Sequence, residues 1–224
     1  MLGRPTQRYR NREEAGRVLA RALGHYAGRP DVVLLALPRG GVPIAFEVAE
    51  ALDAPLDVFV VRKLGVPGHE ELAMGAIATG DTRVLNHAVI RDLAISSALI
   101  DEVTVAERRE LERREKKYRG ERPPLDLRGR TVILIDDGLA TGSTMRAAIA
   151  AVRQKSPTKI VVGVQVAPTD ACEDLNGEVD EIVCARTPEP FYAVGLWYEE
   201  FDQTTDEEVH DLLERSRARS LAPR

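Results

Sequence analysis

TVILIDDGLATGST, residues 131–144 and here called the deciding stretch, is the most informative segment of the sequence. Residues 131–135 form an apolar, mostly β-branched run, which is typical of a strand buried on both faces of a parallel sheet. Asp136 and Asp137 follow at the carboxyl end of that strand, and a loop of small and hydroxyl-bearing residues leads into a helical run at 145–154. In open α/β sheets ligands bind at this edge, because loops and helix amino-termini converge there. We therefore expect two carboxylates beside an anion-binding loop.

The alternation of strands and helices along the chain extends this prediction to the whole fold. Asn11 and Glu14 are typical of a helix start, and apolar residues follow them at helical spacing. Helical runs, of which 42–52 is an example, separate further expected strands at residues 31–37, 56–61, 159–166 and 181–184. This order predicts an α/β fold with a doubly wound, mostly parallel sheet flanked by helices. A single domain over residues 1–224 is the simplest partition.

Residues 62–130 interrupt the alternation and predict a flexible hairpin followed by a long helix. The hairpin is expected to turn at Gly80 and Asp81, with strands at 72–78 and 82–85, and to be preceded by a mobile loop at 65–68.

A long helix is expected at residues 97–118, inside an insertion that spans about 86–128. Its second half carries glutamates four residues before basic residues, of which Glu110 with Arg114 is the first pair. This pattern is typical of a solvated helix.

Composition and charge exclude several classes of function. The net charge of −5 gives no general attraction to nucleic acid or to an anionic membrane, and no apolar run approaches a membrane span. The two cysteines, Cys172 and Cys184, lack metal-ligand spacing and the four histidines are scattered, so we expect neither a metal cluster nor a disulfide framework. The amino-terminal residues lack the apolar segment of a signal peptide, which predicts a cytoplasmic protein.

The deciding stretch lacks the Walker A spacing, so a triphosphate cradle is disfavoured. It resembles the 5-phosphoribosyl-1-pyrophosphate (PRPP) signature of the type I phosphoribosyltransferases, an apolar strand followed by two acids and a threonine-glycine loop. The resemblance implies that Asp136 and Asp137 bind the ribose hydroxyls, with Mg²⁺ held mainly through PRPP oxygens. It also implies a 5′-phosphate loop made of Gly138, Ala140, Thr141, Gly142, Ser143 and Thr144. A plain Asp-Gly turn would explain Asp137 and Gly138 but not the hydroxyl cluster.

Two further segments fit the same resemblance. Arg39, Gly40 and Gly41 follow an expected strand and precede a helix, so the turn resembles the family's pyrophosphate loop, in which a strained peptide is frequent. Lys63, at the end of the next expected strand, is the second candidate cation for pyrophosphate. Taken alone, the first segment is better explained as a glycine-rich strand-to-helix turn, and it is the pairing with the acid loop that favours the functional interpretation. For Lys63 the alternative is a solvated strand end. Three residues in the expected mobile loop region are open candidates for orienting the nucleophile or the metal: His69, Glu70 and Glu71.

The acceptor side of the site is less defined. An aromatic cluster at 190–198 implies a hood over about 187–224, in which Phe191, Tyr192 or Trp197 would stack on a base. Core filling explains each of these residues equally well. Ala140 stands where hypoxanthine-type enzymes carry a third aspartate, which leaves the identity of the base open.

The leading hypothesis is a phosphoribosyltransferase that moves 5-phosphoribosyl from PRPP to a purine or pyrimidine base and releases pyrophosphate. The alternative is a PRPP-binding regulatory protein without transferase activity. An RNA-binding protein on the same fold would need a basic face that this charge-mixed sequence does not offer. The expected partners are PRPP, pyrophosphate and a small base, with no nucleic acid or membrane, and a homodimer is the expected assembly.

Overall fold

The computed structural model describes residues 8–221, except for the side chains of Glu70, Glu71 and Leu221. Its centre is a five-stranded parallel sheet with the strand order β2-β1-β6-β7-β8. The strands are β1 (Val32–Ala36), β2 (Leu56–Val58), β6 (Thr131–Asp136), β7 (Lys159–Val164) and β8 (Glu181–Cys184). This sheet confirms the predicted α/β class.

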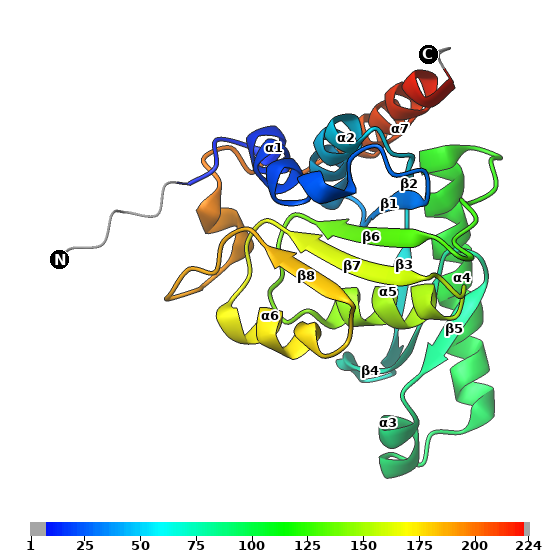
Figure 1. Ribbon diagram of the computed structural model, residues 1–224. Coiled ribbons are helices and arrows are strands. Elements are labelled where there is room, and N and C mark those ends of the chain that lie inside the picture. The colour runs from blue at the N-terminus through cyan, green and yellow to red at the C-terminus, as the bar shows by residue number, and fades with distance from the viewer. Residues whose placement is uncertain (1–7, 222–224) are drawn as a thin grey trace.

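Helices cover both faces of the sheet (Figure 1). One face carries α1 (Arg12–Ala22), α2 (Gly41–Leu52) and α7 (Asp206–Leu221), and the other carries α5 (Ser143–Arg153) and α6 (Thr169–Asn176). Alternate residues of β6 enter the two layers, since Ile133 and Ile135 pack with α1 and α2 whereas Val132 and Leu134 pack with α5. Burial on both faces is the physical reason why the deciding stretch is apolar without interruption.

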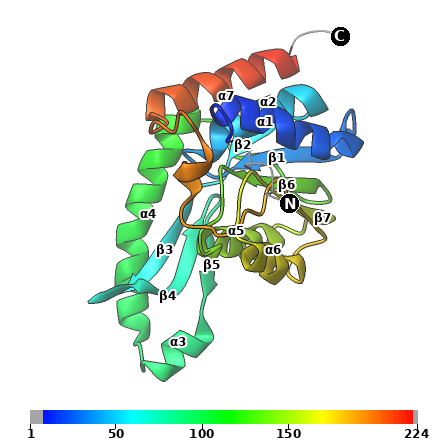
Figure 2. The same ribbon diagram turned by 90° about the vertical axis from the view of Figure 1, so that its left-hand side faces the viewer.

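A second, antiparallel sheet stands beside the first (Figure 2). Its strands are β3 (Val61–Val66), β4 (His69–Ala78) and β5 (Thr82–Leu85), in that order. The predicted hairpin between the last two is confirmed.

The strand predicted at 56–61 is wrong in its extent, because the chain changes sheet inside it. Phe59 N still donates to Ala36 O of the parallel sheet at 2.9 Å, whereas Val60 O accepts from Thr79 N of the second sheet at 2.9 Å. The loop expected at 65–68 is also shorter than predicted. Strand β3 continues to Val66, and Pro67 and Gly68 make the turn into β4.

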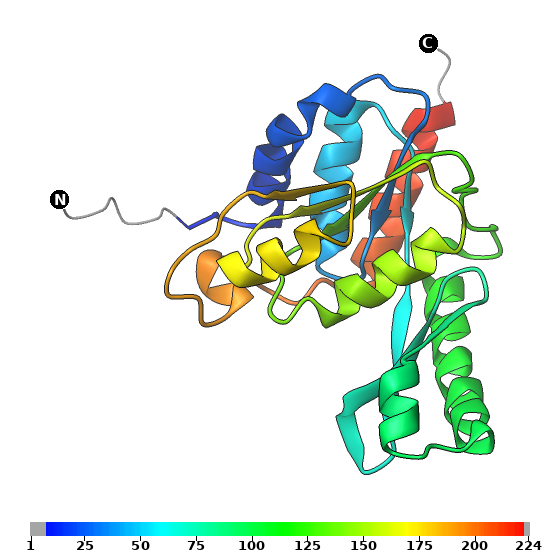
Figure 3. The same ribbon diagram turned by 60° about the horizontal axis from the view of Figure 1, so that its bottom comes forward.

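Helix α4 (Ser97–Arg119) confirms the predicted long helix and follows the short α3 (His87–Asp92). It runs along the second sheet (Figures 2 and 3). The expectation of a solvated helix is wrong on the side that faces this sheet and α7, where Leu111 and Tyr118 are buried. These two side chains are one heptad apart and therefore lie on the same face of the helix. Next to the buried face, the Glu110–Arg114 pair forms with 2.7 Å between Oε1 and Nε, and both side chains are half-buried.

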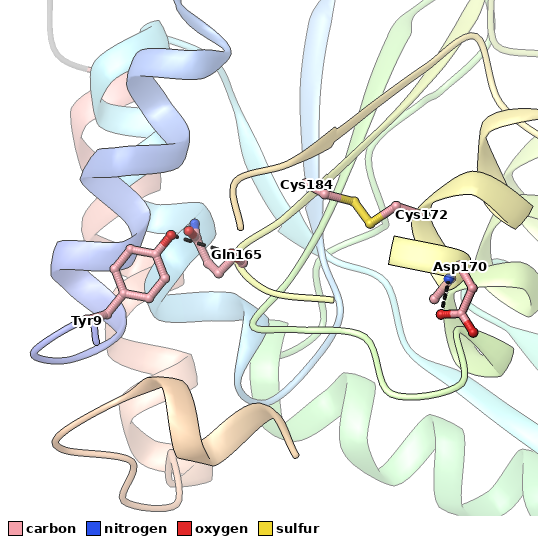
Figure 4. Close-up of a disulfide and its surroundings, with 6 residues drawn as sticks. Tyr9, Gln165, Asp170, Cys172 and Cys184 are labelled. Carbon is pink, nitrogen blue, oxygen red and sulfur yellow. Dashed lines mark hydrogen bonds between the residues drawn. A yellow bond between two sulfur atoms is a disulfide. The ribbon is translucent and has the colours of Figure 1, made fainter. Parts of the chain in front are cut away.

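The prediction of no disulfide is wrong. Cys172 of α6 and Cys184 of β8 are bonded to each other (Figure 4). Helix α6 folds back along β8 and brings the two Cα atoms to 6.6 Å, a closeness that the scattered sequence positions do not reveal. The remaining short helices are η1 (Gly24–Tyr26) and η2 (Val194–Trp197). No helix among residues 8–221 is long and apolar enough to cross a membrane.

Candidate functional site

The two acids of the deciding stretch lie together at the carboxyl edge of the parallel sheet. Asp136 ends β6, and Asp137 N donates to Asp136 Oδ1 at 2.8 Å. Burial, reinforced by the neighbouring charge of Asp137, raises the pKa of Asp136 well above its ordinary value. Burial also raises the pKa of Asp137, against the opposing effect of Arg12. Two adjacent carboxylates in this setting favour hydroxyl donors or positive charge in contact with them.

Arg12 is the partner of Asp137 and was missed by the sequence analysis. Its Nε and Nη2 atoms both lie 2.9 Å from Asp137 Oδ2, and its Nη1 donates to Asp202 O at 2.7 Å. The guanidinium carbon lies 4.0 Å from the ring centroid of Phe201. Arg12 is the first residue of α1, so the Asn11 cap that fixes the start of the helix also fixes this arginine. Only its place directly after that cap pointed to it in the sequence.

Tyr198 contacts the main-chain carbonyl of the same residue, Asp137. Its hydroxyl donates to Asp137 O at 2.7 Å, and its ring stacks on Phe201 with 4.9 Å between centroids. The predicted aromatic segment therefore reaches the acid pair, but through residues other than the three named as stacking candidates.

The turn at residues 38–41, here called the glycine turn, packs directly on the acid pair. A Cβ atom on Gly40 would lie 2.0 Å from Asp137 Oδ2, and one on Gly41 would lie 2.6 Å from Ile135 O. Both positions therefore accept only glycine without a shift of β6 or its acid. The peptide bond between Pro38 and Arg39 is cis. The glycine turn and the acids therefore form one packed unit, and the predicted contact of this turn with pyrophosphate stays a prediction.

Arg39 itself points elsewhere. Its Nη1 lies 3.6 Å from Asp206 Oδ1, at the start of α7, and its side chain is 33% exposed. The same carboxylate accepts from Lys117 Nζ at 2.8 Å and from the Tyr118 hydroxyl at 3.0 Å. The structure thus places the Arg39 side chain at the junction of α4 and α7.

Residues 138–144, here called the phosphate loop, open the amino-terminus of α5. Gly142 is left-handed (φ 68°) and directly precedes the first residue of the helix, Ser143. The Thr141 hydroxyl lies 3.2 Å from the Ser143 hydroxyl and accepts from Ser143 N at 3.4 Å. The side chains of Ala140, Thr141, Ser143 and Thr144 are exposed. The loop therefore presents hydroxyls and the positive end of a helix to solvent, which suits an anion.

Lys63 lies close to this loop although it belongs to β3 of the second sheet. A groove of about 680 Å³ is lined by Lys63, Thr141 and Ser143 together. Arg146 of α5 lines the same groove and pairs with Glu178 at 2.8 Å and Asp174 at 3.1 Å. Lys63 reaches the loop because β3, in the second sheet, packs against α5. His69 is exposed at the first position of β4, and the side chains of Glu70 and Glu71 lie outside the described part of the chain.

The three stacking candidates have different environments. Tyr192 is 78% exposed, whereas Phe191 and Trp197 are half-buried and pack against the main core. Trp197 Nε1 is buried and has no hydrogen-bond partner among the described residues.

Several buried polar side-chain atoms lie around Tyr9, next to Trp197. Tyr9 N donates to Trp197 O at 2.9 Å, and the Tyr9 hydroxyl lies 3.4 Å from Gln165 O (Figure 4). The guanidinium of Arg186 lies 3.8 Å from the centroid of the Tyr9 ring. The side-chain amide of Gln165 is fully buried, and neither of its polar atoms has a partner among the described residues. Unpaired polar atoms of this kind cost free energy and are few in native proteins, so this end of the site is more polar than its aromatic sequence indicated.

Known proteins are similar to this chain in sequence and in fold. The model of the family described as "Phosphoribosyl transferase domain" matches residues 7–185. The chain belongs to this family. Two Mycobacterium tuberculosis proteins, from strains CDC 1551 and H37Rv and provisionally named as phosphoribosyl transferases, are each 47% identical to it over 206 residues. These matches cover 92% of the chain and 46% of each relative, so the chain spans about half the length of these curated relatives.

A solved structure extends the likeness to three dimensions. The crystal structure of TT1426 from Thermus thermophilus is 41% identical, with a TM-score of 0.84 over 93% of this chain and 99% of that one. Such a score means that the strand order and the helix layers described above are shared with TT1426, whose name states no activity.

The donor set bears on the Mg²⁺ that the family resemblance implies. No group of three or more His, Cys, Asp or Glu side chains suited to a metal ion exists among the described residues. Mg²⁺ commonly keeps several waters and is bound through one or two carboxylates plus substrate phosphates. The carboxylates of Asp136 and Asp137 fit that mode and do not form a complete protein cage.

Proposed function

We propose that this chain transfers the 5-phosphoribosyl group of PRPP to a nitrogenous base and releases pyrophosphate. The observation that carries the proposal is the convergence of three elements on one sheet edge: the acid pair, the glycine turn and the phosphate loop. Each element suits a different part of PRPP, namely the ribose hydroxyls, the pyrophosphate and the 5′-phosphate. The matches to the curated relatives cover only about half the length of each relative, so the activity is proposed here and is not carried over from them.

The chain's residues would act mainly by positioning and by neutralising charge. Asp136 and Asp137 accept hydrogen bonds from the ribose hydroxyls, and residues 140–144 hold the 5′-phosphate at the start of α5. Lys63 faces the same groove and balances the charge of the phosphate groups. Arg39 contributes to the departing pyrophosphate if its side chain exchanges Asp206 for the ligand. That exchange is inexpensive, because a partly exposed ion pair at 3.6 Å contributes little to stability.

We further propose that Mg²⁺ accompanies PRPP and that the carboxylates of Asp136 and Asp137 would help to hold it together with PRPP. When bound, the ion would stabilise negative charge on the leaving group.

The acceptor base would bind under residues 187–200, where the aromatic segment meets the acid pair. Stacking on Phe191, Tyr192 or Trp197 remains our prediction, and Ala140 leaves the loop without an acid to select a hypoxanthine-type base. A homodimer and a cytoplasmic location also remain predictions.

Calorimetric titration with PRPP, with and without Mg²⁺, tests the donor half of the proposal. Asp136→Asn/Asp137→Asn should lose binding, whereas Asp211→Asn, an exposed change on α7, should bind as the unmodified protein does. Equal binding by the double variant would exclude the acid pair as the ribose site.

A screen of purine and pyrimidine bases for pyrophosphate release tests the transfer. Turnover with any base supports an enzyme. PRPP binding without turnover would favour the second candidate, a PRPP-dependent regulatory protein. One observation favours that candidate, because Arg12 already occupies the Asp137 carboxylate that the ribose would need.

A further inference from the structure

A cavity of about 310 Å³ lies beside the edge strand β2 and shares no lining residue with the groove at the phosphate loop. Its walls come from β2, the end of α4, the loop that follows α4, and α7. Polar side chains line one part of it: Asp57, Arg119, Arg122, Ser216, Arg217 and Ser220. Pro123, Leu125 and Leu213 line the apolar part. We refer to it as the β2 cavity.

Two deeply buried side chains carry polar atoms at this cavity without a hydrogen-bond partner among the described residues. Ser216 is 1% exposed and its hydroxyl is unpaired. Arg119 is 5% exposed and its Nε makes no hydrogen bond, although Asp57 Oδ1 lies 3.3 Å away. A buried hydroxyl that gives up water without gaining a partner costs free energy, so Ser216 points to a group that enters the cavity.

Three arginines line the cavity, and two of them, Arg122 and Arg217, can turn to an incoming anion. Arg119 is held by Asp57, by Glu115 at 3.5 Å and by Val58 O at 3.0 Å. Arg122 contacts Glu214 at 2.5 Å, but the Glu214 side chain is 45% exposed and can be displaced.

Arg217 is exposed, and within residues 8–221 it has neither an ion pair nor a hydrogen bond. Among the charged residues that line the cavity, three are cationic and one, Asp57, is anionic. The lining therefore has a positive balance, which Glu214 and Glu115 offset from outside it.

We propose that the β2 cavity binds a small organic anion. Its phosphate or carboxylate head group would contact Arg122, Arg217 and the Ser216 hydroxyl, while its apolar body would lie against Pro123, Leu125 and Leu213. Arginine forks match both head groups bidentately, and a volume of about 310 Å³ lies in the range of small-ligand sites. This site is independent of the proposed transfer reaction.

Calorimetry with phenyl phosphate and with benzoate tests the proposal, because each probe joins an anionic head to a compact apolar body. Arg217→Ala should weaken the binding of the better probe by about tenfold or more, the equivalent of one charged hydrogen bond. Ser216→Ala should weaken it less. Glu214→Gln should strengthen it, because Arg122 is then released from its competitor.

Arg215→Ala is the matched control. Arg215 lies two residues earlier on α7, and its guanidinium lies 4.6 Å from the centroid of the Phe46 ring instead of lining the cavity. Unchanged binding in this variant, beside weaker binding in Arg217→Ala, supports the proposal.

The phosphate loop is the competing location for a phosphate probe, so Thr141→Ala/Thr144→Ala is titrated in parallel. Binding that is lost in this variant and kept in Arg217→Ala would overturn the proposal. Absence of saturable binding of both probes to the unmodified protein would overturn it as well.

Discussion

Two aspartate–arginine pairs lie at different parts of the same parallel sheet and have different roles. Asp57 of β2 pairs with Arg119 of α4, and Asp137 after β6 pairs with Arg12 of α1. Asp57 is enclosed, since its carboxylate also accepts from Val58 N at 2.8 Å and Leu125 N at 3.3 Å. It fixes the end of α4 and the following loop to the edge strand.

Asp137 lies instead between the glycine turn and the aromatic segment, at an edge lined by loops. Its side chain is 17% exposed and that of Asp57 is 10% exposed. This contrast indicates that backbone donors to the carboxylate, rather than the presence of an arginine, separate a pair that joins structural elements from a pair at the proposed PRPP site. The following predictions test this contrast.

The largest effect is expected for Arg119→Ala. Removing the partner of a buried carboxylate leaves an uncompensated charge, which typically costs about 3–5 kcal/mol of unfolding free energy. Urea unfolding followed by circular dichroism measures it. Arg113→Ala, in an exposed pair on the same helix, should leave the midpoint unchanged. A small loss in Arg119→Ala would mean that Asp57 is not held by this pair.

Arg12→Ala should cost less stability, about 1–3 kcal/mol, because the loops around Asp137 can relax and admit water. Arg12 lowers the pKa of Asp137, so its removal should raise that pKa and move the acid limb of PRPP binding to higher pH. Unfolding and calorimetry at several pH values measure both effects. If Arg12→Ala were as destabilising as Arg119→Ala and left the pH profile in place, the contrast between the pairs would fail.

Gly40→Ala should cost about 1–3 kcal/mol through overpacking, because its Cβ would lie 2.0 Å from Asp137 Oδ2. PRPP binding should weaken with it, since the displaced carboxylate belongs to the proposed ribose site. Gly24→Ala is the control, because nothing lies within 4 Å of a Cβ at that position. Equal behaviour of the two variants would show that the glycine turn does not depend on close contact with the acid.

The smallest effect concerns pH. Burial raises the pKa of Asp57 above its ordinary value of 3.8, so the folded state binds the proton more tightly than the unfolded state does. The contribution of Asp57 to stability should therefore increase as pH falls from neutral through its raised pKa, and level off below 3.8. Unfolding free energies of the unmodified protein and Asp57→Asn, compared between neutral pH and about pH 4, measure the trend. The unmodified protein should gain stability relative to Asp57→Asn as pH falls, and a relative loss over this range would contradict the prediction.

Much of the fold was predictable from local patterns. The buried run before Asp136, the glycines at 40 and 41, and the loop of hydroxyl residues each carry their own structural preference, independent of distant residues. The predicted strand at 56–61 was wrong because its second half pairs with Thr79 of another sheet, and a continuous apolar run does not show which sheet it joins.

Local patterns were sufficient to predict the parallel sheet, the acid pair at its edge and the loop that opens α5, because periodicity and glycine content act over short distances. The residues that surround these features became evident only in the folded chain. Arg12 meets Asp137 across 125 residues, and Lys63 meets the phosphate loop from a different sheet. The Cys172–Cys184 bond likewise needed α6 to fold back on β8. Such contacts follow from the packing of whole elements, and the sequence around each residue does not fix which partner it meets.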